Sequence, residues 1–153
     1  MDFRLVTIHG EKIHQNVYEV ILPTVTGEIS VFPGHEPLVT IAKTGVVAVR
    51  YKKEDPDDEL EYFAISGGVV EVDDDYLKIL VDEADRGDDI VEADSLAALE
   101  RAKKMREDAQ DQVELEKAHQ LVDRHEVRLK VAELRRRSRR HHQRSQSMHD
   151  SEL

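Results

Sequence analysis

The chain has no cysteine and no tryptophan, and positive charge is scarce along most of its length. The absence of cysteine excludes a disulfide framework, a thiolate metal site and a cysteine nucleophile. No apolar run approaches the roughly 20 residues that a membrane-spanning helix needs, and the first residues lack the basic and apolar regions of a signal peptide. At 153 residues, about the length of one domain, the composition predicts a soluble intracellular protein.

Glycine, proline and aromatic residues are missing from the second part of the chain. All 7 glycines lie at or before Gly87, all 4 prolines at or before Pro56, and every aromatic residue at or before Tyr76. Because Gly and Pro mark turns and aromatic residues favour strands, residues 1–90 are predicted to be β-rich and residues 91–137 helical.

Charge divides at the same place. Residues 1–90 hold 8 basic and 20 acidic side chains, whereas residues 91–153 hold 14 and 13. The net charge of -11 argues against nucleic-acid binding by the whole chain. Six arginines nevertheless lie between Arg135 and Arg144 with no acid among them. This run could bind nucleic acid, anionic lipid or an acidic protein surface, or form a solvated helix end, and residues 138–153 are predicted to be a basic, disordered tail.

Short apolar runs bounded by turn residues follow one another through the first segment. Many short strands at close spacing predict a sandwich or barrel. The expected strands cover residues 3–8, 17–22, 29–32, 38–42, 46–51, 62–65, 69–72 and 76–81.

The second segment shows apolar residues at three- and four-residue steps, which is typical of helices. One stripe is followed by another, with polar residues 107–112 between them, so both a helical hairpin and one long helix are open. Asp94 or Ser95 is the expected N-cap. The two stripes consist of Leu96, Leu99, Ala102, Met105 and Ala109, and of Ala118, Leu121, Val122, His125, Leu129 and Ala132.

Catalytic and metal-binding motifs are absent from the sequence. It has no phosphate-binding loop and no Gly-x-Ser-x-Gly elbow, and the Gly pair after Ser66 is better explained by a tight turn. The eight histidines lack metal-ligand spacing, and the acidic turns at 55–59 and 73–75 lack the EF-hand pattern and are interpreted as solvated. The residues therefore predict a non-catalytic protein without cofactor or metal.

Three stretches carry a resemblance to a known family. Residues 23–40, PTVTGEISVFPGHEPLVT, contain Gly-Glu followed by a Pro-Gly-His-x-Pro-Leu turn; residues 66–72 and 80–84 read SGGVVEV and LVDEA; residues 129–134 read LKVAEL. In this order and spacing they resemble the epsilon subunit of bacterial F-type ATP synthases over roughly residues 3–137. The resemblance implies a mainly β fold with α, in which an N-terminal β-sandwich precedes a C-terminal α-helical hairpin.

The resemblance also implies a function. It indicates a central-stalk rotor subunit that performs no chemistry and couples proton flow to ATP synthesis. In many members of the family the C-terminal helices inhibit ATP hydrolysis, so an inhibitory and a purely structural role are both open for the helices of this chain. Implied partners are the gamma subunit, the c-subunit ring and, through the helices, the catalytic alpha and beta subunits. The implied location is the cytoplasmic face of the cell membrane, as a peripheral protein without a transmembrane segment. The alternative is a β-sandwich adaptor that binds nucleic acid or anionic lipid through the Arg-rich tail.

The family motif carries site residues over to this chain. The expected partner-binding residues, at a lower rim of the sandwich, are Glu28, Pro33, Gly34, His35 and Pro37. The basic run is the second candidate, expected to meet an acidic surface of the catalytic subunits when the helices are extended. Its residues are Arg135, Arg136, Arg137, Arg139 and Arg140.

One family motif is not matched. Some relatives bind ATP through an Ile/Leu-Asp-x-x-Arg-Ala motif, where this chain has Val91, Asp94 and Ser95 at the Asp, Arg and Ala positions. We therefore predict no regulatory nucleotide site.

Overall fold

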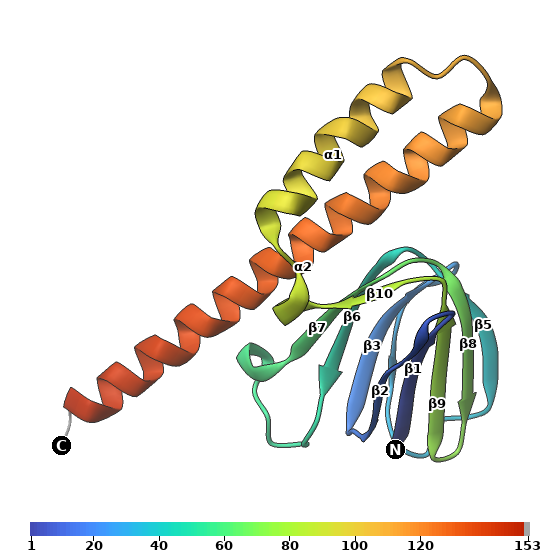
Figure 1. The fold of residues 1–153 in the computed structure, drawn as a ribbon. Coiled ribbons are helices and arrows are strands. Elements are labelled where there is room, and N and C mark those ends of the chain that lie inside the picture. Colours follow the sequence, from blue (N-terminus) through green and yellow to red (C-terminus); the bar gives the residue numbers. More distant parts are fainter. Residues whose placement is uncertain (152–153) are drawn as a thin grey trace.

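The computed structural model describes residues 1–151, which form a β-sandwich followed by two helices (Figure 1). Each of the eight segments predicted to be a strand contains a β-strand in the structure. The strands are β1 Asp2–Thr7, β2 Gly10–Asn16, β3 Glu19–Thr24, β4 Gly27–Val31, β5 Leu38–Ala42, β6 Gly45–Arg50, β7 Glu61–Ile65, β8 Gly68–Asp73, β9 Tyr76–Val81 and β10 Ala84–Arg86. Two short 3₁₀ turns, η1 Asp57–Glu59 and η2 Gly87–Asp89, flank β7 and β10.

The strands form one hydrogen-bonded series that bends round into the sandwich. Its order is β10-β7-β6-β3-β5-β8-β9-β1-β2, with β4 attached to β3. Strands β1 and β9 pair in parallel from Asp2 opposite Tyr76 to Thr7 opposite Val81, while the other pairs are antiparallel. Alternate side chains of a strand point to opposite faces, which gives β1 its alternating burial. The largest fully buried side chains include Phe3, Leu5, Leu22, Phe63, Ile65 and Leu77.

The helices form an antiparallel hairpin, which resolves the choice left open by the sequence. Helix α1 spans Glu92–Glu107 and helix α2 spans Gln112–Ser151. Asp111 caps α2, because its carboxylate accepts a hydrogen bond of 2.8 Å from the backbone N–H of Glu114. The expected cap of α1 is wrong: Val91 is the N-cap residue, with no side-chain hydrogen bond, and Ser95 is buried.

Apolar contacts between the helices are few. Leu99 and Ala102 of α1 pack with Val122 of α2, and Leu121 and Leu129 border this cluster. Leu96 and Met105, which belong to the first predicted stripe, are about half exposed. The hairpin extends away from the sandwich at its loop end, while the middle of α2 crosses β7 (Figure 1).

The structure differs from the predicted disorder of residues 138–153. Helix α2 continues to Ser151 and projects past the sandwich (Figure 1), while residues 152–153 lie outside the described part. The segment contains no Gly or Pro, and arginine and glutamine are good helix formers. Despite its low apolar content, the segment from residue 138 to residue 151 is helical because it continues a helix that is docked on the sandwich. No helix within residues 1–151 is long and apolar enough to cross a bilayer.

Candidate partner-binding surfaces

The Pro-Gly-His segment forms the rigid turn that the sequence predicted. Pro33 and Gly34 occupy the centre of a turn in which the N–H of His35 donates to the carbonyl of Phe32 at 3.2 Å. Gly34 has φ of 83°, the left-handed conformation required at the third position of a type II turn. Its N–H also donates to the carbonyl of Asp74 at 2.7 Å, which ties this turn to the β8–β9 turn.

Side chains of this turn are directed by local bonds. The Nδ1 atom of His35 lies 2.7 Å from the carbonyl oxygen of Glu36, and Pro37 is exposed just before β5 begins. Glu28 is also exposed, but it lies at the start of β4, opposite Pro23. The structure therefore brings four of the five predicted residues together and separates Glu28 from them by the length of β4.

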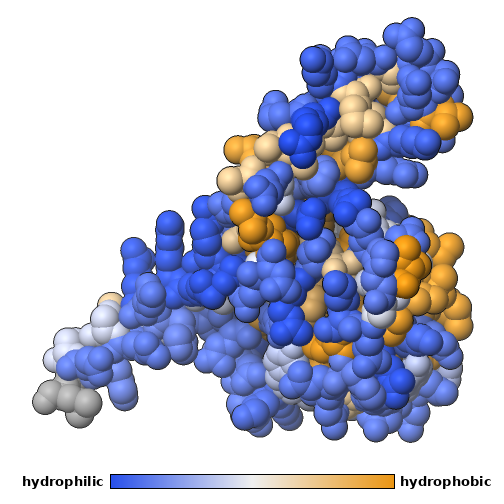
Figure 2. Space-filling view, viewed as in Figure 1, coloured by the Kyte–Doolittle hydropathy of each residue, from blue (hydrophilic) through white to orange (hydrophobic). Residues whose placement is uncertain are grey.

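An apolar band on the outer face of the sandwich was not predicted. Ile41, Val69 and Leu80 are neighbours across β5, β8 and β9, since Ile41 pairs with Val69 and Val69 with Leu80. These three side chains are 56%, 48% and 45% exposed, and Val39 on β5 is 73% exposed. Figure 2 shows hydrophobic surface at the edge of the molecule formed by β5 and β8. A row of outward apolar residues across adjacent strands is typical of an interaction surface.

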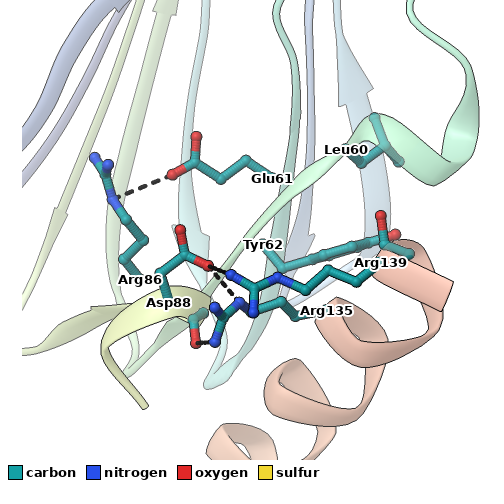
Figure 3. Close-up of a pocket in the computed structure, with 9 residues that line it drawn as sticks. Leu60, Glu61, Tyr62, Arg86, Asp88, Arg135 and Arg139 are labelled. Carbon is teal, nitrogen blue, oxygen red and sulfur yellow. Dashed lines mark hydrogen bonds and ion pairs between the residues drawn. The ribbon is translucent and has the colours of Figure 1, made fainter. Parts of the chain in front are cut away.

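The basic run lies against acidic residues of its own chain. Arg135 and Arg139 both face Asp88 of η2, Arg139 at 3.7 Å (Figure 3). Arg136 pairs with Glu92 of α1 at 3.1 Å. Arg137 pairs within α2, with Glu133 at 2.6 Å, and Arg140 makes no ion pair within residues 1–151.

The acidic turn around η1 also contacts α2. The hydroxyl of Ser138 donates to the backbone carbonyl of Asp58, and Nδ1 of His141 lies 3.6 Å from the Asp58 carboxylate. The interpretation of residues 55–59 as merely solvated is therefore incomplete. The turn also serves as a surface on which α2 lies.

Arg50 holds this acidic turn in place. Its guanidinium donates to Glu19 at 2.8 Å, to Asp57 at 2.7 Å and to the backbone carbonyl of Asp55. These carboxylates, Glu19 first, raise the pKa of Arg50, so the guanidinium remains charged. A charged donor shared between strand β3 and the turn forms strong hydrogen bonds, which fix the turn against which α2 lies.

A second group of charges lies where α2 passes β10. Arg124 pairs with Glu83, and Arg128 pairs with Asp85 at 3.0 Å. The Nδ1 atom of His125, between them in sequence, is buried without a hydrogen-bond partner. Burial lowers the pKa of His125, and the nearby arginines lower it further. No group of three or more His, Asp or Glu side chains within residues 1–151 is arranged to hold a metal ion.

These features define a class of protein: a β-sandwich with a docked helical hairpin, whose exposed apolar band and rigid turn suit protein partners. Comparison with known proteins identifies the family. Residues 1–87 match the model described as ATP synthase, Delta/Epsilon chain, beta-sandwich domain. The chain therefore belongs to the ATP synthase delta/epsilon chain family.

Relatives match beyond the sandwich. The ATP synthase epsilon chain of Rippkaea orientalis is 36% identical over 120 residues, which are 76% of this chain and 85% of the relative. The epsilon chain of Staphylococcus aureus strain JH9 is 35% identical over 136 residues, 88% of this chain and 98% of the relative.

Solved structures show the same fold. A chain in the Euglena gracilis mitochondrial ATP synthase structure of OSCP/F1/c-ring superposes with a TM-score of 0.70 at 23% identity, covering 82% of this chain and 77% of that one. A chain in the Tetrahymena thermophila central stalk/c-ring structure gives 0.52 at 14% identity, covering 86% of this chain and 96% of that one.

Proposed function

We propose that this chain is the epsilon subunit of an F-type ATP synthase, a rotor component of the central stalk that couples ion flow to ATP synthesis. The observation that supports this most is the match to an epsilon chain along 98% of that relative's length, so both the sandwich and the helices have counterparts. As a stalk subunit it would catalyse no reaction itself. It would lie peripherally, at the cytoplasmic face of the cell membrane.

The exposed apolar band is the proposed binding surface for the gamma subunit. Ile41, Val69 and Leu80 form a continuous row on the sheet, and burying roughly half-exposed side chains of this size gains on the order of 1 kcal/mol each. The row lies on paired strands and needs no rearrangement, so little entropy is lost when a partner binds.

The rigid turn is the proposed contact with the c-subunit ring. Pro33, Gly34, His35 and Pro37 form a turn that is fixed to the β8–β9 turn by the bond from Gly34 to Asp74. Glu28 lies at the other end of β4, so we propose that it contacts a different part of the stalk.

Binding to gamma provides the test. The full chain is mixed with the gamma subunit of the same genome and analysed by size exclusion, with Val69→Lys as the test variant and Val113→Lys as its control. Both valines are exposed, but Val113 lies at the start of α2. We expect a one-to-one complex for the native chain and the control, and none for Val69→Lys at micromolar concentration. No complex for the native chain would contradict the stalk role, and equal binding by both variants would contradict the assignment of the band.

The basic run is proposed to act on the catalytic subunits when α2 leaves the sandwich. Arg135, Arg136, Arg137, Arg139 and Arg140 would then meet an acidic surface of the alpha and beta subunits and restrain ATP hydrolysis. Exposed Arg–carboxylate pairs contribute about 0–1 kcal/mol each and are screened by salt. Removing the residues after Leu134 is expected to raise ATP hydrolysis by the assembled enzyme, and unchanged hydrolysis at both low and high salt would contradict this role.

The alternative function, an adaptor for nucleic acid or anionic lipid, has no support from the comparisons. Residues 1–90 carry 20 acidic side chains against 8 basic ones, which would repel either polyanion.

A further inference from the structure

Near β10, the first part of α2 forms the Arg124–Glu83 and Arg128–Asp85 ion pairs. Further along, two contacts of different kinds hold α2 on the sandwich. The first is a small apolar cluster in which Val131 and Ala132 pack on Ala64 and Ile90. This cluster buries far fewer side chains than the core of the sandwich. Burial of so little apolar area gives only modest stabilisation, so the polar contact that follows along α2 has a large share in the docking.

The second contact begins one turn later and consists of charged and polar groups. Arg135 and Arg139 lie one helical turn apart and therefore on the same face of α2. Both face the single carboxylate of Asp88, and a guanidinium N–H of Arg135 also donates to the carbonyl of Gly87 at 3.4 Å. Figure 3 shows the two guanidinium groups converging on Asp88 from α2.

Further along α2 lies a second acceptor. Ser138 donates to the carbonyl of Asp58, and His141 approaches the Asp58 carboxylate. This acceptor belongs to the turn that Arg50 holds. The segment of α2 from Arg135 to His141 therefore lies between two acidic turns, η1, which precedes β7, and η2, which follows β10. Because β7 and β10 pair in antiparallel fashion, both turns lie at the same end of this strand pair.

We propose that residues 135–141 form an electrostatic latch, which fastens α2 to the η1 and η2 turns of its own sandwich and sets the fraction of molecules with docked helices. Arg135 and Arg139 cannot bind Asp88 and an acidic partner surface at the same time. Docking on the sandwich and contact with a partner therefore compete for the same guanidinium groups. The latch itself is intramolecular and does not depend on the proposed function, although the competition does.

Docking of α2 on the sandwich can be measured directly in the full chain. Because it contains no cysteine, Glu54→Cys and Ser147→Cys provide two label sites without further substitution, one near η1 and one on the end of α2. Pulsed electron paramagnetic resonance on the isolated full chain then reports the distance between them. Docked helices give a narrow distribution and released helices a broad, longer one.

Charge substitutions separate a latch from a general charge effect. The double variant Arg135→Glu/Arg139→Glu is expected to lower the ratio of docked to released molecules about tenfold, which corresponds to about 1.4 kcal/mol. Adding Asp88→Arg to this variant is expected to restore much of the docked population. The control is Arg140→Glu, which reverses one charge on the same helix at a residue without an ion pair within residues 1–151 and is expected to leave the distribution unchanged.

Two outcomes of the distance measurement would overturn the latch. An unchanged distribution in the double variant, or an equal loss of docking in the Arg140→Glu control, contradicts it. Circular dichroism establishes that each variant keeps its sandwich. Should the double variant fail to fold, Asp88→Asn and the native chain at 1 M salt replace it, since both weaken the ion pairs; docking that resists both would overturn the proposal. No partner subunit is present, so this outcome is independent of the gamma-binding test.

Discussion

Replacement of Gly68 by alanine should destabilise the sandwich strongly. Gly68 begins β8 and pairs with both Ala42 of β5 and Val81 of β9. A Cβ atom there would overlap the carbonyl oxygen of Leu80 and lie 2.9 Å from both the Leu80 carbonyl carbon and the Val81 Cα. All three atoms are backbone, so no side chain can rotate away. Overpacking typically costs about 1–3 kcal/mol, and we expect the upper end of this range, about 3 kcal/mol.

Chemical and thermal unfolding measure this cost. For a chain of this size, about 3 kcal/mol corresponds to a fall in Tm of roughly 6–12 °C. Gly34→Ala is the control: nothing lies within 4 Å of its added Cβ, and only the positive φ of 83° opposes the change, at about 1–2 kcal/mol. A loss below about 1 kcal/mol for Gly68→Ala, or a loss no greater than that of Gly34→Ala, would refute the reasoning.

Three further predictions concern the titration of a histidine, the hydrogen bond of a partly buried tyrosine hydroxyl, and nucleotide binding. Burial favours the neutral form of His125. Its contribution to stability is therefore present above its ordinary pKa of about 6.5 and is lost as the pH falls. A proton NMR titration of His125 should give a midpoint below 6.5, and a midpoint at or above that value would contradict a lowered pKa. Tyr51 donates to Glu61, and burial first, then Glu61, raises its pKa; Tyr51→Phe should cost about 1 kcal/mol in urea unfolding, and an unchanged midpoint would count against the bond. Because residues 90–95 lack the nucleotide motif, calorimetry should detect no ATP binding by the isolated chain at physiological concentration, and measurable binding would overturn that prediction.

The sequence predicted eight of the ten strands within residues 1–151 and missed β2 and β10, each of which contributes a single buried residue to the core. All eight predicted runs alternate or concentrate apolar residues, which reflects burial on one face. Strand β2 escaped notice because only Ile13 among its residues is buried, so no apolar pattern marks an edge strand of this kind. Strand β10 has three residues, too few to show any period.

The candidate surfaces were predicted unevenly, for reasons that lie in particular residues. The Pro33-Gly34 turn could be predicted because proline and glycine fix a backbone conformation locally. The separation of Glu28 from that turn depends on how far β4 runs, which no motif states. The apolar band could have been found by asking which strand positions are apolar on the outward face, since Val39 and Ile41 alternate with the inward residues of β5.

Contacts between distant segments were the least accessible to sequence reasoning. The arginines of α2 and the acids of η1 were recognised as charged groups, whereas Asp88 of η2 was not singled out. The pairing of these groups depends on where the hairpin lies. The predicted partner of the arginines is an acidic surface of the catalytic subunits, and this stays a prediction. The structure adds that the sandwich of the same chain supplies acids such as Asp88. Likewise, composition alone predicted disorder for residues 138–153, whereas continuity with a docked helix extends α2 to Ser151.

The parallel pairing of β1 with β9 has a consequence for how the molecule folds. Asp2 meets Tyr76 in this pair, so the sandwich cannot close until the chain has been synthesised and extended from the ribosome past residue 81. Contacts so distant in sequence form slowly, whereas the α1–α2 hairpin requires only local contacts and can form within microseconds. We therefore expect the closing of the sandwich to limit the folding rate, with α2 docking only after its two acidic turns have been assembled.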